Sequence, residues 1–502
     1  MEGSGASSGK PARAMDHKAT HGPGAADDEY INASGHVQEL RRNFSLFSLA
    51  GIGLVVGNVW PAIGGSILVA IFNGGPPGLL YEFMAVSVCY WNVAASKHFR
   101  ARQLHARWGR PVGFFAGWWN YFAWLLGAAS MTSIFGNTIV QMYAVMRPGF
   151  VARQWHVFVA YVLFTWVACL SVIFANRLMP GLNRAGALCI VAFFLVTVVV
   201  VATMPGLEGH PGHASSAFVW TQWTADIGYP DGFVFLAGML NGSYSVGPVD
   251  AVTHLAEEIP HPESNVPLAI AMQVSIGFVT GLAYLVAVLY AINDYDGLLR
   301  SQYPIAEIYR QATGSNAGAC ALLSLILVTI SFTVLGLHIT CGRTLWALAR
   351  DGATPMQDKL MHISPRQHIP VYTTVVSAVL TTLLGAIYVG STTAFNAFVS
   401  GFILLSSSSF VACILPNILT GRRNIRYGPF RLGRVVGFLV NGVSCLYLLV
   451  WGVIYTFPPT LPTNAETMNY SSLIWGGLTI FVAVLWFFKA SKGYRGPLQD
   501  HL

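Results

Sequence analysis

Charged residues are scarce in this chain of 502 residues, since Asp, Glu, Lys and Arg together make up only 10% of it. Soluble globular domains usually carry about 25% charged residues. Because the deficit extends along the whole length and 54% of the residues are hydrophobic, the composition excludes an ordinary soluble protein and indicates a polytopic membrane protein. The apolar runs are continuous rather than alternating, which argues against a transmembrane β-barrel.

Signals of catalysis and metal binding are also missing. The seven cysteines fall in or beside apolar runs, and none has a partner at metal-ligand or redox spacing. His210 and His213 could be imagined as a metal pair, but no further ligand accompanies them. No serine nucleophile elbow, phosphate-binding loop, zinc pattern or paired-carboxylate motif is present. We therefore expect no enzyme activity, no cofactor and no metal site.

The ends of the chain differ from its middle. Residues 1–42 are rich in Gly, Ala, Ser, His and charge, without an apolar core of signal-peptide length. The sequence predicts a disordered cytosolic tail over 1–42, a transporter domain over 43–488 and a cytosolic tail over 489–502.

Apolar runs predict about twelve transmembrane helices, which is the number that this length accommodates. The expected spans are 44–71, 76–95, 112–145, 155–175, 183–204, 232–253, 267–292, 317–346, 371–390, 393–419, 435–457 and 471–488. With the N-terminus inside, all but four of the 28 Lys and Arg residues fall on the cytosolic side. The exceptions are Arg147, Arg153, Arg300 and Arg310. The net charge of +7 therefore reflects the orientation of the chain in the membrane, and we expect no nucleic-acid partner.

Two of these spans contain residues that interrupt a helix. Span one has five glycines and a proline within residues 51–65. In span six, the interruption is expected at Gly242, Gly247 and Pro248, because glycine costs up to about 1 kcal/mol and proline about 3 kcal/mol in a helix interior. The two spans run in opposite directions, which is typical of inverted-repeat secondary transporters that bind substrate between half-helices. The alternative is that glycine and proline serve close packing of membrane helices.

Three blocks of the sequence resemble a known family. They are residues 51–60 (GIGLVVGNVW), residues 247–260 (GPVDAVTHLAEEIP) and residues 342–355 (GRTLWALARDGATP). The chain is similar to fungal amino acid/choline permeases (GABA/choline type) of the amino acid–polyamine–organocation (APC) superfamily over roughly residues 40–490. The resemblance implies an all-α LeuT-type fold with a 5+5 inverted repeat, broken helices 1 and 6, and two trailing helices.

The sequence departs from this family after span two. Family members usually carry a Ser-x-Ala-Glu-Leu-x-Ser-x-x-Pro-x-x-Gly-Gly-Gln stretch there, and this chain does not. Glu82 stands in the same span, which is otherwise apolar.

The interrupted helices supply the candidate site residues. Free backbone groups at a helix break favour a carboxylate at half-helix N-termini, and an ammonium or a cation at exposed carbonyls. Aromatic rings attract ammonium groups, although Trp and Tyr also form interfacial belts. The predicted substrate-binding residues are Gly53, Gly57, Asn58, Trp60, Asn241, Gly242, Tyr244 and Ser245.

Two acidic residues are candidates for coupling or gating. A carboxylate at membrane depth is costly and is a functional-site hypothesis by default, which favours Asp250. By resemblance, Asp250 also lies near the family's acidic position in helix six. The alternative is that it caps the second half-helix. Glu257 is either part of an ion pair at the cytosolic mouth or the solvated end of the segment.

The sequence thus predicts a permease for a small nitrogenous solute such as an amino acid, a GABA-like zwitterion or choline. Family precedent favours proton-coupled import in a fungal plasma membrane, with lipid around the helices. The alternatives are export of a basic or zwitterionic fungal metabolite, and a nutrient sensor that retains the fold without transport.

Overall fold

The computed structural model describes residues 46–67, 71–96, 106–147, 149–258, 261–390, 393–422, 429–430, 432–465, 467–490 and 494. These residues all belong to one compact unit, Leu40–Pro497. The predicted tail over 1–42 lies outside the described residues, as do residues 495–502 of the predicted C-terminal tail.

Every regular element in these described ranges is a helix, which confirms the all-α class. Each predicted span corresponds to one helix, or to a pair of helices in span one. They are α1 (Leu46–Val56) with α2 (Val59–Ser66), α3 (Gly75–Ser96), α4 (Ala106–Met146), α5 (Gln154–Phe174), α6 (Met179–Thr203), α8 (Asp231–Val246), α9 (Pro262–Tyr290), α12 (Asn316–Arg350), α14 (Val371–Gly390), α15 (Ala394–Leu419), α16 (Arg434–Ile454) and α17 (Ser471–Leu485). Short helices connect them: η3 (Asn176–Leu178), η4 (Met204–Gly206), α7 (Ser216–Trp220), η5 (Ala251–Glu258), α10 (Tyr295–Leu299), α11 (Pro304–Thr313), α13 (Gln357–Leu360) and η6 (Trp486–Ala490).

Length and apolarity agree with a membrane protein. Among the described residues, nine helices are long and apolar enough to cross a membrane, and the stretch Val371–Ile387 of α14 is apolar but shorter. Helix α8 has only 16 residues because it ends at a break. Since a span usually needs about 20 residues, α8 must cross together with the segment that follows it.

Burial separates the central helices from those at the periphery. The most apolar stretch of α1 and α2 is 94% buried and that of α4 is 89% buried, whereas that of α17 is only 11% buried. Apolar side chains that face outward from α17, such as Leu473 and Ile480, are exposed. A helix that is apolar all round but exposed needs a lipid neighbour, so α17 lies at the edge of the bundle and α1, α2 and α4 form its centre.

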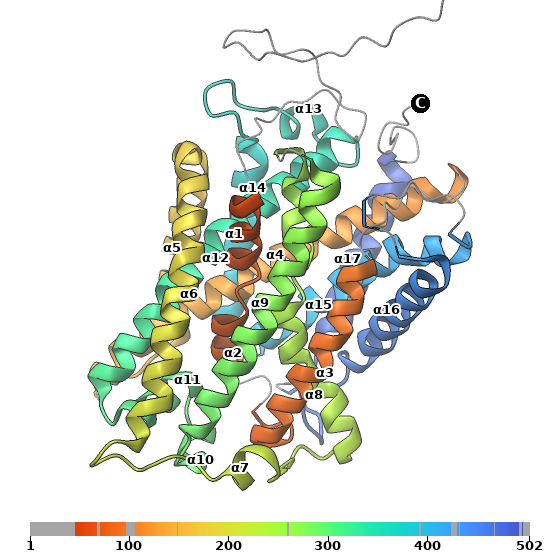
Figure 1. The fold of residues 1–502 in the computed structure, drawn as a ribbon. Coiled ribbons are helices and arrows are strands. Elements are labelled where there is room, and N and C mark those ends of the chain that lie inside the picture. The colour runs from red at the N-terminus through yellow and green to blue at the C-terminus, as the bar shows by residue number, and fades with distance from the viewer. Residues whose placement is uncertain are drawn as a thin grey trace, which may run out of the picture. The chain divides into compact units, whose positions relative to one another are not determined.

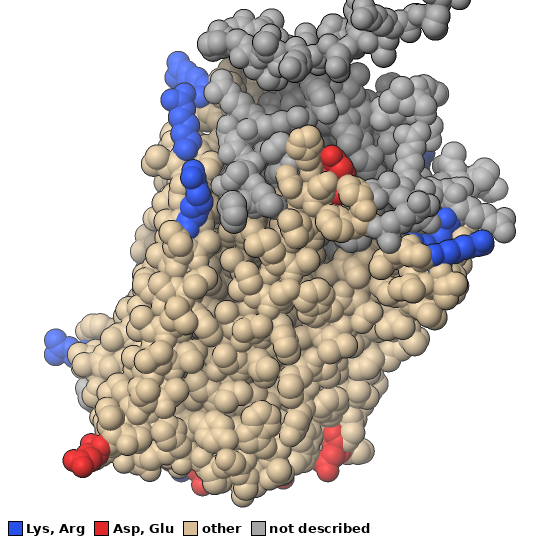
Figure 2. Space-filling model, in the orientation of Figure 1, with Lys and Arg blue, Asp and Glu red and all other residues tan. Residues whose placement is uncertain are grey.

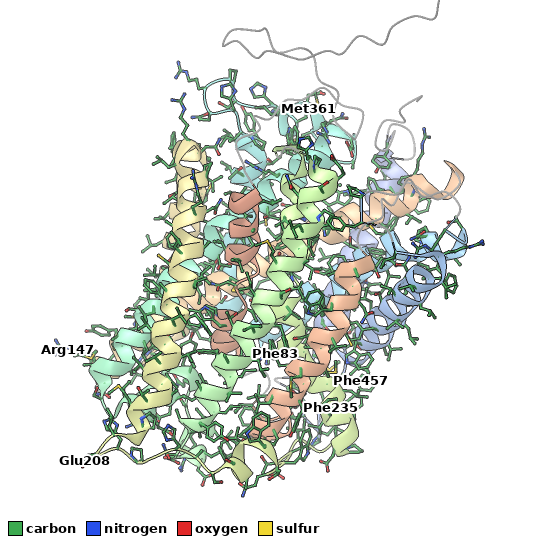
Figure 3. The ribbon with its side chains drawn as sticks, viewed as in Figure 1. Phe83, Arg147, Glu208, Phe235, Met361 and Phe457 are labelled. Carbon is green, nitrogen blue, oxygen red and sulfur yellow. The ribbon has the colours of Figure 1, made fainter. Side chains whose placement is uncertain are left out.

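The two ends of the bundle are marked by Glu208 and Met361 (Figure 3). Helices α7 and α10 lie at the Glu208 end, and α13 lies at the Met361 end (Figure 1). On the face drawn in Figure 2, most Lys and Arg side chains lie toward the Met361 end, and a broad uncharged band separates them from acidic side chains at the other end. This band has the character of a surface in contact with hydrocarbon.

Both predicted interruptions are present, but the second lies later than the glycines suggest. Gly57 and Asn58 separate α1 from α2. In span six, the regular helix continues through Gly242 to Val246 and is interrupted at Gly247 and Pro248. The expectation that Gly242 interrupts the helix is therefore wrong. Gly242 instead faces α3, where a Cβ would overlap Val86, so its role is close helix packing.

Candidate functional site

Proline chemistry explains where the first break falls. Pro61 is the third residue of α2 and has no N–H to donate to the Gly57 carbonyl, which weakens a continuous helix at this point. Asn58 directly precedes α2, and its Nδ2 donates to Thr333 Oγ1 of α12 at 3.1 Å. Thr333 Oγ1 in turn donates to the Val55 carbonyl oxygen at 2.7 Å. The end of α1 and the start of α2 are thus both held by α12.

The second break follows the same logic. Pro248 cannot donate to the Tyr244 carbonyl, and α8 ends two residues earlier. The chain turns tightly, with the Val249 N–H donating to the Gly247 carbonyl at 2.7 Å. It then forms η5, a 3₁₀ helix rather than the second α-helical half that the sequence pattern suggests. Non-helical backbone is tolerated at membrane depth only where protein buries it or a cavity solvates it.

Gln273 of α9 joins the two breaks, and sequence reasoning missed it. Its Nε2 donates to the Pro248 carbonyl oxygen at 2.9 Å. A Cβ on Gly57 would overlap the same amide, and one on Gly53 would stand 3.0 Å from its Oε1. Both glycines are therefore needed for this approach. The available signal was a single glutamine in an apolar span, since a buried polar side chain in a membrane needs a partner.

Two acceptors at the first break have no partner. Asn58 Oδ1 and Gln273 Oε1 are both buried and form no hydrogen bond within the described part of the chain. Both side chains are only 3% exposed. An unsatisfied buried carbonyl costs roughly 1–3 kcal/mol, so these oxygens are suited to accept from an ammonium group or to coordinate a cation.

Asp250 follows the second break, and its carboxylate contacts Asn120 of α4 and His254 of η5. Asn120 Nδ2 of α4 donates to Asp250 Oδ2 at 2.7 Å. His254 Nε2 lies 3.4 Å from the same carboxylate oxygen, and His254 Nδ1 lies 3.3 Å from Thr344 Oγ1 of α12. Asp250 thereby connects η5 to α4 and, through His254, to α12. Neither His254 nor Asn120 was among the sequence-predicted residues.

The predicted aromatic residues do not form one group. Tyr244 packs edge-on against Phe402 of α15, with ring centroids 6.0 Å apart, and its hydroxyl bonds to Ser130 Oγ at 2.8 Å. Trp124 of α4 contacts the same Phe402 ring and the His254 ring. These aromatic rings therefore cluster beside the second break.

Trp60 lies elsewhere. Its ring packs on Tyr284 of α9 with centroids 5.4 Å apart, and its Nε1 donates to the Ile190 carbonyl of α6 at 3.3 Å. Trp60 therefore faces α6 and α9, and its contacts differ from those of Tyr244.

The remaining predicted residues also do not gather around one point. Ser66 Oγ of α2 donates to Asn241 Oδ1, which joins α2 to α8. Ser245 bonds to the Asn241 carbonyl within its own helix. The side chain of Glu257 lies outside the described part of the structure. In the residues that are described, no group of three or more His, Cys, Asp or Glu could hold a metal ion.

The chain matches known proteins over nearly its whole length. A family model described as amino acid permease covers residues 44–478. A choline transporter of Saccharomyces cerevisiae is 31% identical over 510 residues, which span 97% of this chain and 86% of that protein. A putative amino acid/polyamine transporter of Macrophomina phaseolina is 28% identical over 445 residues, 84% of this chain and 97% of that protein. A polyamine transporter of Saccharomyces cerevisiae is 24% identical, covering 97% and 82%.

Proposed function

This chain belongs to the amino acid permease family, and from that premise we propose that it carries a small nitrogenous solute across a membrane by secondary active transport. The observation that carries the proposal is the meeting of two interrupted helices across Gln273. Broken helices at membrane depth expose backbone polar groups that can bind an ion or solute, and such breaks recur in secondary transporters.

The solute-binding surface is proposed to lie along the first break and the start of the second. Asn58 Oδ1 and Gln273 Oε1 are buried acceptors without a partner among the described residues, and they suit an ammonium group. Gly53 and Gly57 let the Gln273 amide lie close against the backbone at the same place, and we propose that the solute binds beside it. Asn241, Gly242 and Ser245 are proposed to shape the α8 side of the site.

The aromatic cluster supports recognition of a cationic headgroup. A desolvated aromatic ring attracts an ammonium group by about 2 kcal/mol, and Tyr244, Phe402 and Trp124 pack together beside the second break. Amino acids, GABA-like zwitterions and choline all carry such a group. The names of the relatives, which include choline and polyamine transporters, agree with this chemistry.

Alternating access requires the site to open to one side at a time. The residues at the breaks are buried in this conformation: Asn58, Tyr244 and Asp250 are all less than a tenth exposed. We propose that rotation of the α1–α2 and α8–η5 segments against α4, α12 and α15 opens the site. The contacts of Asp250 with Asn120 and His254 would break and reform in this motion, which is the gating role proposed for Asp250 and, at the end of η5, for Glu257.

The proposal also includes the coupling ion, the orientation of the protein in the membrane and its cellular location. We propose that a cation gradient, with the proton as the coupling ion, drives accumulation and that the protein has no enzymatic activity. We propose that the Met361 end and both termini are cytosolic, which the distribution of Lys and Arg in the sequence supports. We also propose a plasma-membrane location, where the protein would import external solutes.

Uptake by a host that lacks its own transporters tests the proposal. The chain is expressed in such yeast cells, and radiolabelled amino acids, GABA, choline and spermidine are supplied at acidic and neutral external pH. We expect at least one solute to accumulate several-fold above vector-only cells, more strongly at acidic pH. The absence of both uptake and efflux for every solute in a surface-expressed protein would overturn the proposal.

The direction of transport separates import from the alternative of export. Cells preloaded with the solute would lose it faster than vector-only cells if the protein exports. A sensor, by contrast, would bind the solute without moving it in either assay.

A further inference from the structure

Glu82 is a buried acidic residue that the site described above does not use. It lies on α3 with only 1% of its surface exposed. Neither carboxyl oxygen has a hydrogen-bond partner among the described residues. An ionised carboxylate that is removed from water and left without a counter-charge is unstable relative to the neutral acid. In this conformation, Glu82 is therefore held as a carboxylic acid.

The carboxyl group borders a very small cavity. The cavity measures about 10 Å³, which is room for about one water molecule. Its lining comes from α2, α3, α8 and α9: Ile63, Leu79, Glu82, Phe83, Gly238, Asn241, Gly242 and Leu285. Glu82 is the one titratable group in this lining, so no neighbouring lining residue supplies a charge that would compensate it.

The size and chemistry of the cavity decide which ligand it can take. Choline or an amino acid is far larger than one water molecule and does not fit. A metal cation needs several oxygen ligands, but the only other polar side chain in the lining, Asn241, already accepts a hydrogen bond from Ser66. A proton that a single water molecule delivers fits the small volume of the cavity and needs no oxygen ligand besides the Glu82 carboxyl group.

The cavity lies within reach of one side of the membrane. Glu82 is the eighth residue of α3 and Gly238 is the eighth residue of α8, so each lies about 10 Å from the start of its helix. Phe83, the neighbour of Glu82, lies in the half of the bundle toward the Glu208 end (Figure 3). The carboxyl group thus lies nearer to the Glu208 end of α3 than to the other end of that helix.

Contact with α8 links the charge of Glu82 to the second break. A Cβ at Gly238 would overlap both carboxyl oxygens of Glu82. Helices α3 and α8 therefore pack through this carboxyl group and a glycine, one turn before Asn241. Because an ionised carboxylate needs water around it, loss of the proton favours separation of α3 from α8, and its return favours the packed arrangement.

We propose that Glu82 is the group that binds and releases the coupling proton during the transport cycle. When α3 and α8 separate, water reaches the carboxyl group, which transfers its proton to that water and becomes a carboxylate with a hydronium ion beside it. Uptake of a proton from water reverses the step and allows the helices to pack again. This assignment rests on the transport function proposed above and names the site of its coupling ion.

Protonation can be measured without any solute. The full chain is purified, reconstituted in lipid nanodiscs, and subjected to pH-difference infrared spectroscopy, which detects the C=O stretch of protonated carboxyl groups. We expect a band from a buried carboxylic acid that is absent in Glu82→Gln and retained in Glu208→Gln, a control with an exposed carboxyl group. A band that persists unchanged in Glu82→Gln overturns the assignment.

Coupling is measured in proteoliposomes with the solute that gives the highest uptake in the panel above. Under an inward proton gradient, Glu82→Gln is expected to accumulate at least ten-fold less solute than wild type. Its solute counterflow is expected to stay within about two-fold of wild type. Glu82→Asp, which keeps a carboxyl group, is expected to recover part of the gradient response. Gradient-driven accumulation by Glu82→Gln at the wild-type level overturns the proposal.

Failure of the two proposals can be told apart. If wild-type protein shows neither uptake nor counterflow, the transport function fails, and the infrared band still decides whether Glu82 is a protonation site. If wild-type protein shows counterflow but no response to a proton gradient, transport stands and the coupling role of Glu82 is refuted. Gel filtration of wild-type protein and of each variant distinguishes a loss of function from misfolding. If Glu82→Gln does not fold, a shift of the infrared band in Glu82→Asp still assigns the band to this residue, and an unshifted band overturns the assignment.

Discussion

Gln273 Nε2 donates to the Pro248 carbonyl oxygen at 2.9 Å, so a side chain of α9 bridges the break in α8 to the break between α1 and α2. The same amide lies against Gly53 and Gly57. A carbonyl freed by a helix break at membrane depth must be satisfied by protein or water. This contact therefore stabilises the buried arrangement of the two breaks and leaves the Gln273 amide oxygen beside them, where we propose that the solute binds.

Replacing Gln273 by alanine should impair transport and stability together. The change removes the donor to Pro248 and leaves a buried carbonyl unsatisfied, which costs roughly 1–3 kcal/mol. We expect uptake to fall about ten-fold and the melting temperature to decrease in a thermal-shift assay. Gln222→Ala is the matched control, because Gln222 is exposed at the Glu208 end. Equal behaviour of the two variants would contradict the bridging role.

Replacing Gly57 by alanine should disrupt the first break. The added methyl group would overlap the Gln273 amide and lie 2.8 Å from the Gly53 carbonyl oxygen. Overpacking of this kind costs about 1–3 kcal/mol, so both the melting temperature and uptake should fall. In Gly442→Ala, the new methyl group meets no atom within 4 Å, and this control should match wild type or melt slightly higher. A wild-type melting temperature for Gly57→Ala would argue against a tight contact.

The role of Tyr244 can be divided between its ring and its hydroxyl group. If the ring attracts an ammonium headgroup with about 0.5–2 kcal/mol, Tyr244→Leu should raise the KM for uptake by about 2- to 30-fold. Tyr244→Phe keeps the ring and loses only the bond to Ser130, so its KM should change less. Tyr143→Leu removes an exposed ring at the end of α4 and serves as the control. A larger effect in Tyr244→Phe than in Tyr244→Leu would favour the hydroxyl group instead.

Neutralising Asp250 should impair gating, and with it transport, but not folding. In Asp250→Asn, the side chain can still accept from Asn120 Nδ2, whereas the contact of the carboxylate with His254 Nε2 is lost. We expect gradient-driven accumulation to fall about ten-fold with expression and gel-filtration profile unchanged. Asp358→Asn, at an exposed position of α13, should behave as wild type. Unchanged proton-driven transport in Asp250→Asn would refute the gating role.

The proposed orientation can be tested by labelling intact cells. Glu208→Cys and Met361→Cys place thiols at exposed positions on opposite ends of the bundle. A membrane-impermeant maleimide should label Glu208→Cys in intact cells and Met361→Cys only after the cells are permeabilised, with wild-type protein as the background control. The reverse pattern would invert the topology.

The sequence by itself determined the helical class, the twelve helices and the presence of two interruptions. The thickness of the hydrocarbon core sets the length of each apolar run and its lack of charged residues. Both features can be read along the chain without knowing which helices are in contact. The break beside Gly57 was equally readable, because Pro61 removes a backbone donor from the helix there.

Tertiary structure alone decided which interrupting residues break a helix and which serve packing. Gly242 looks like a break in the sequence, but α3 approaches so closely that only glycine fits within a continuous helix. The chain alone also did not reveal that Gln273 meets both breaks, that Asp250 pairs with Asn120, or that Trp60 and Tyr244 have separate contacts. Gln273 and Pro248 are 25 positions apart in the sequence, and Asn120 and Asp250 are 130 positions apart. Their geometry depends on how the helices pack, which the pattern along one helix does not specify.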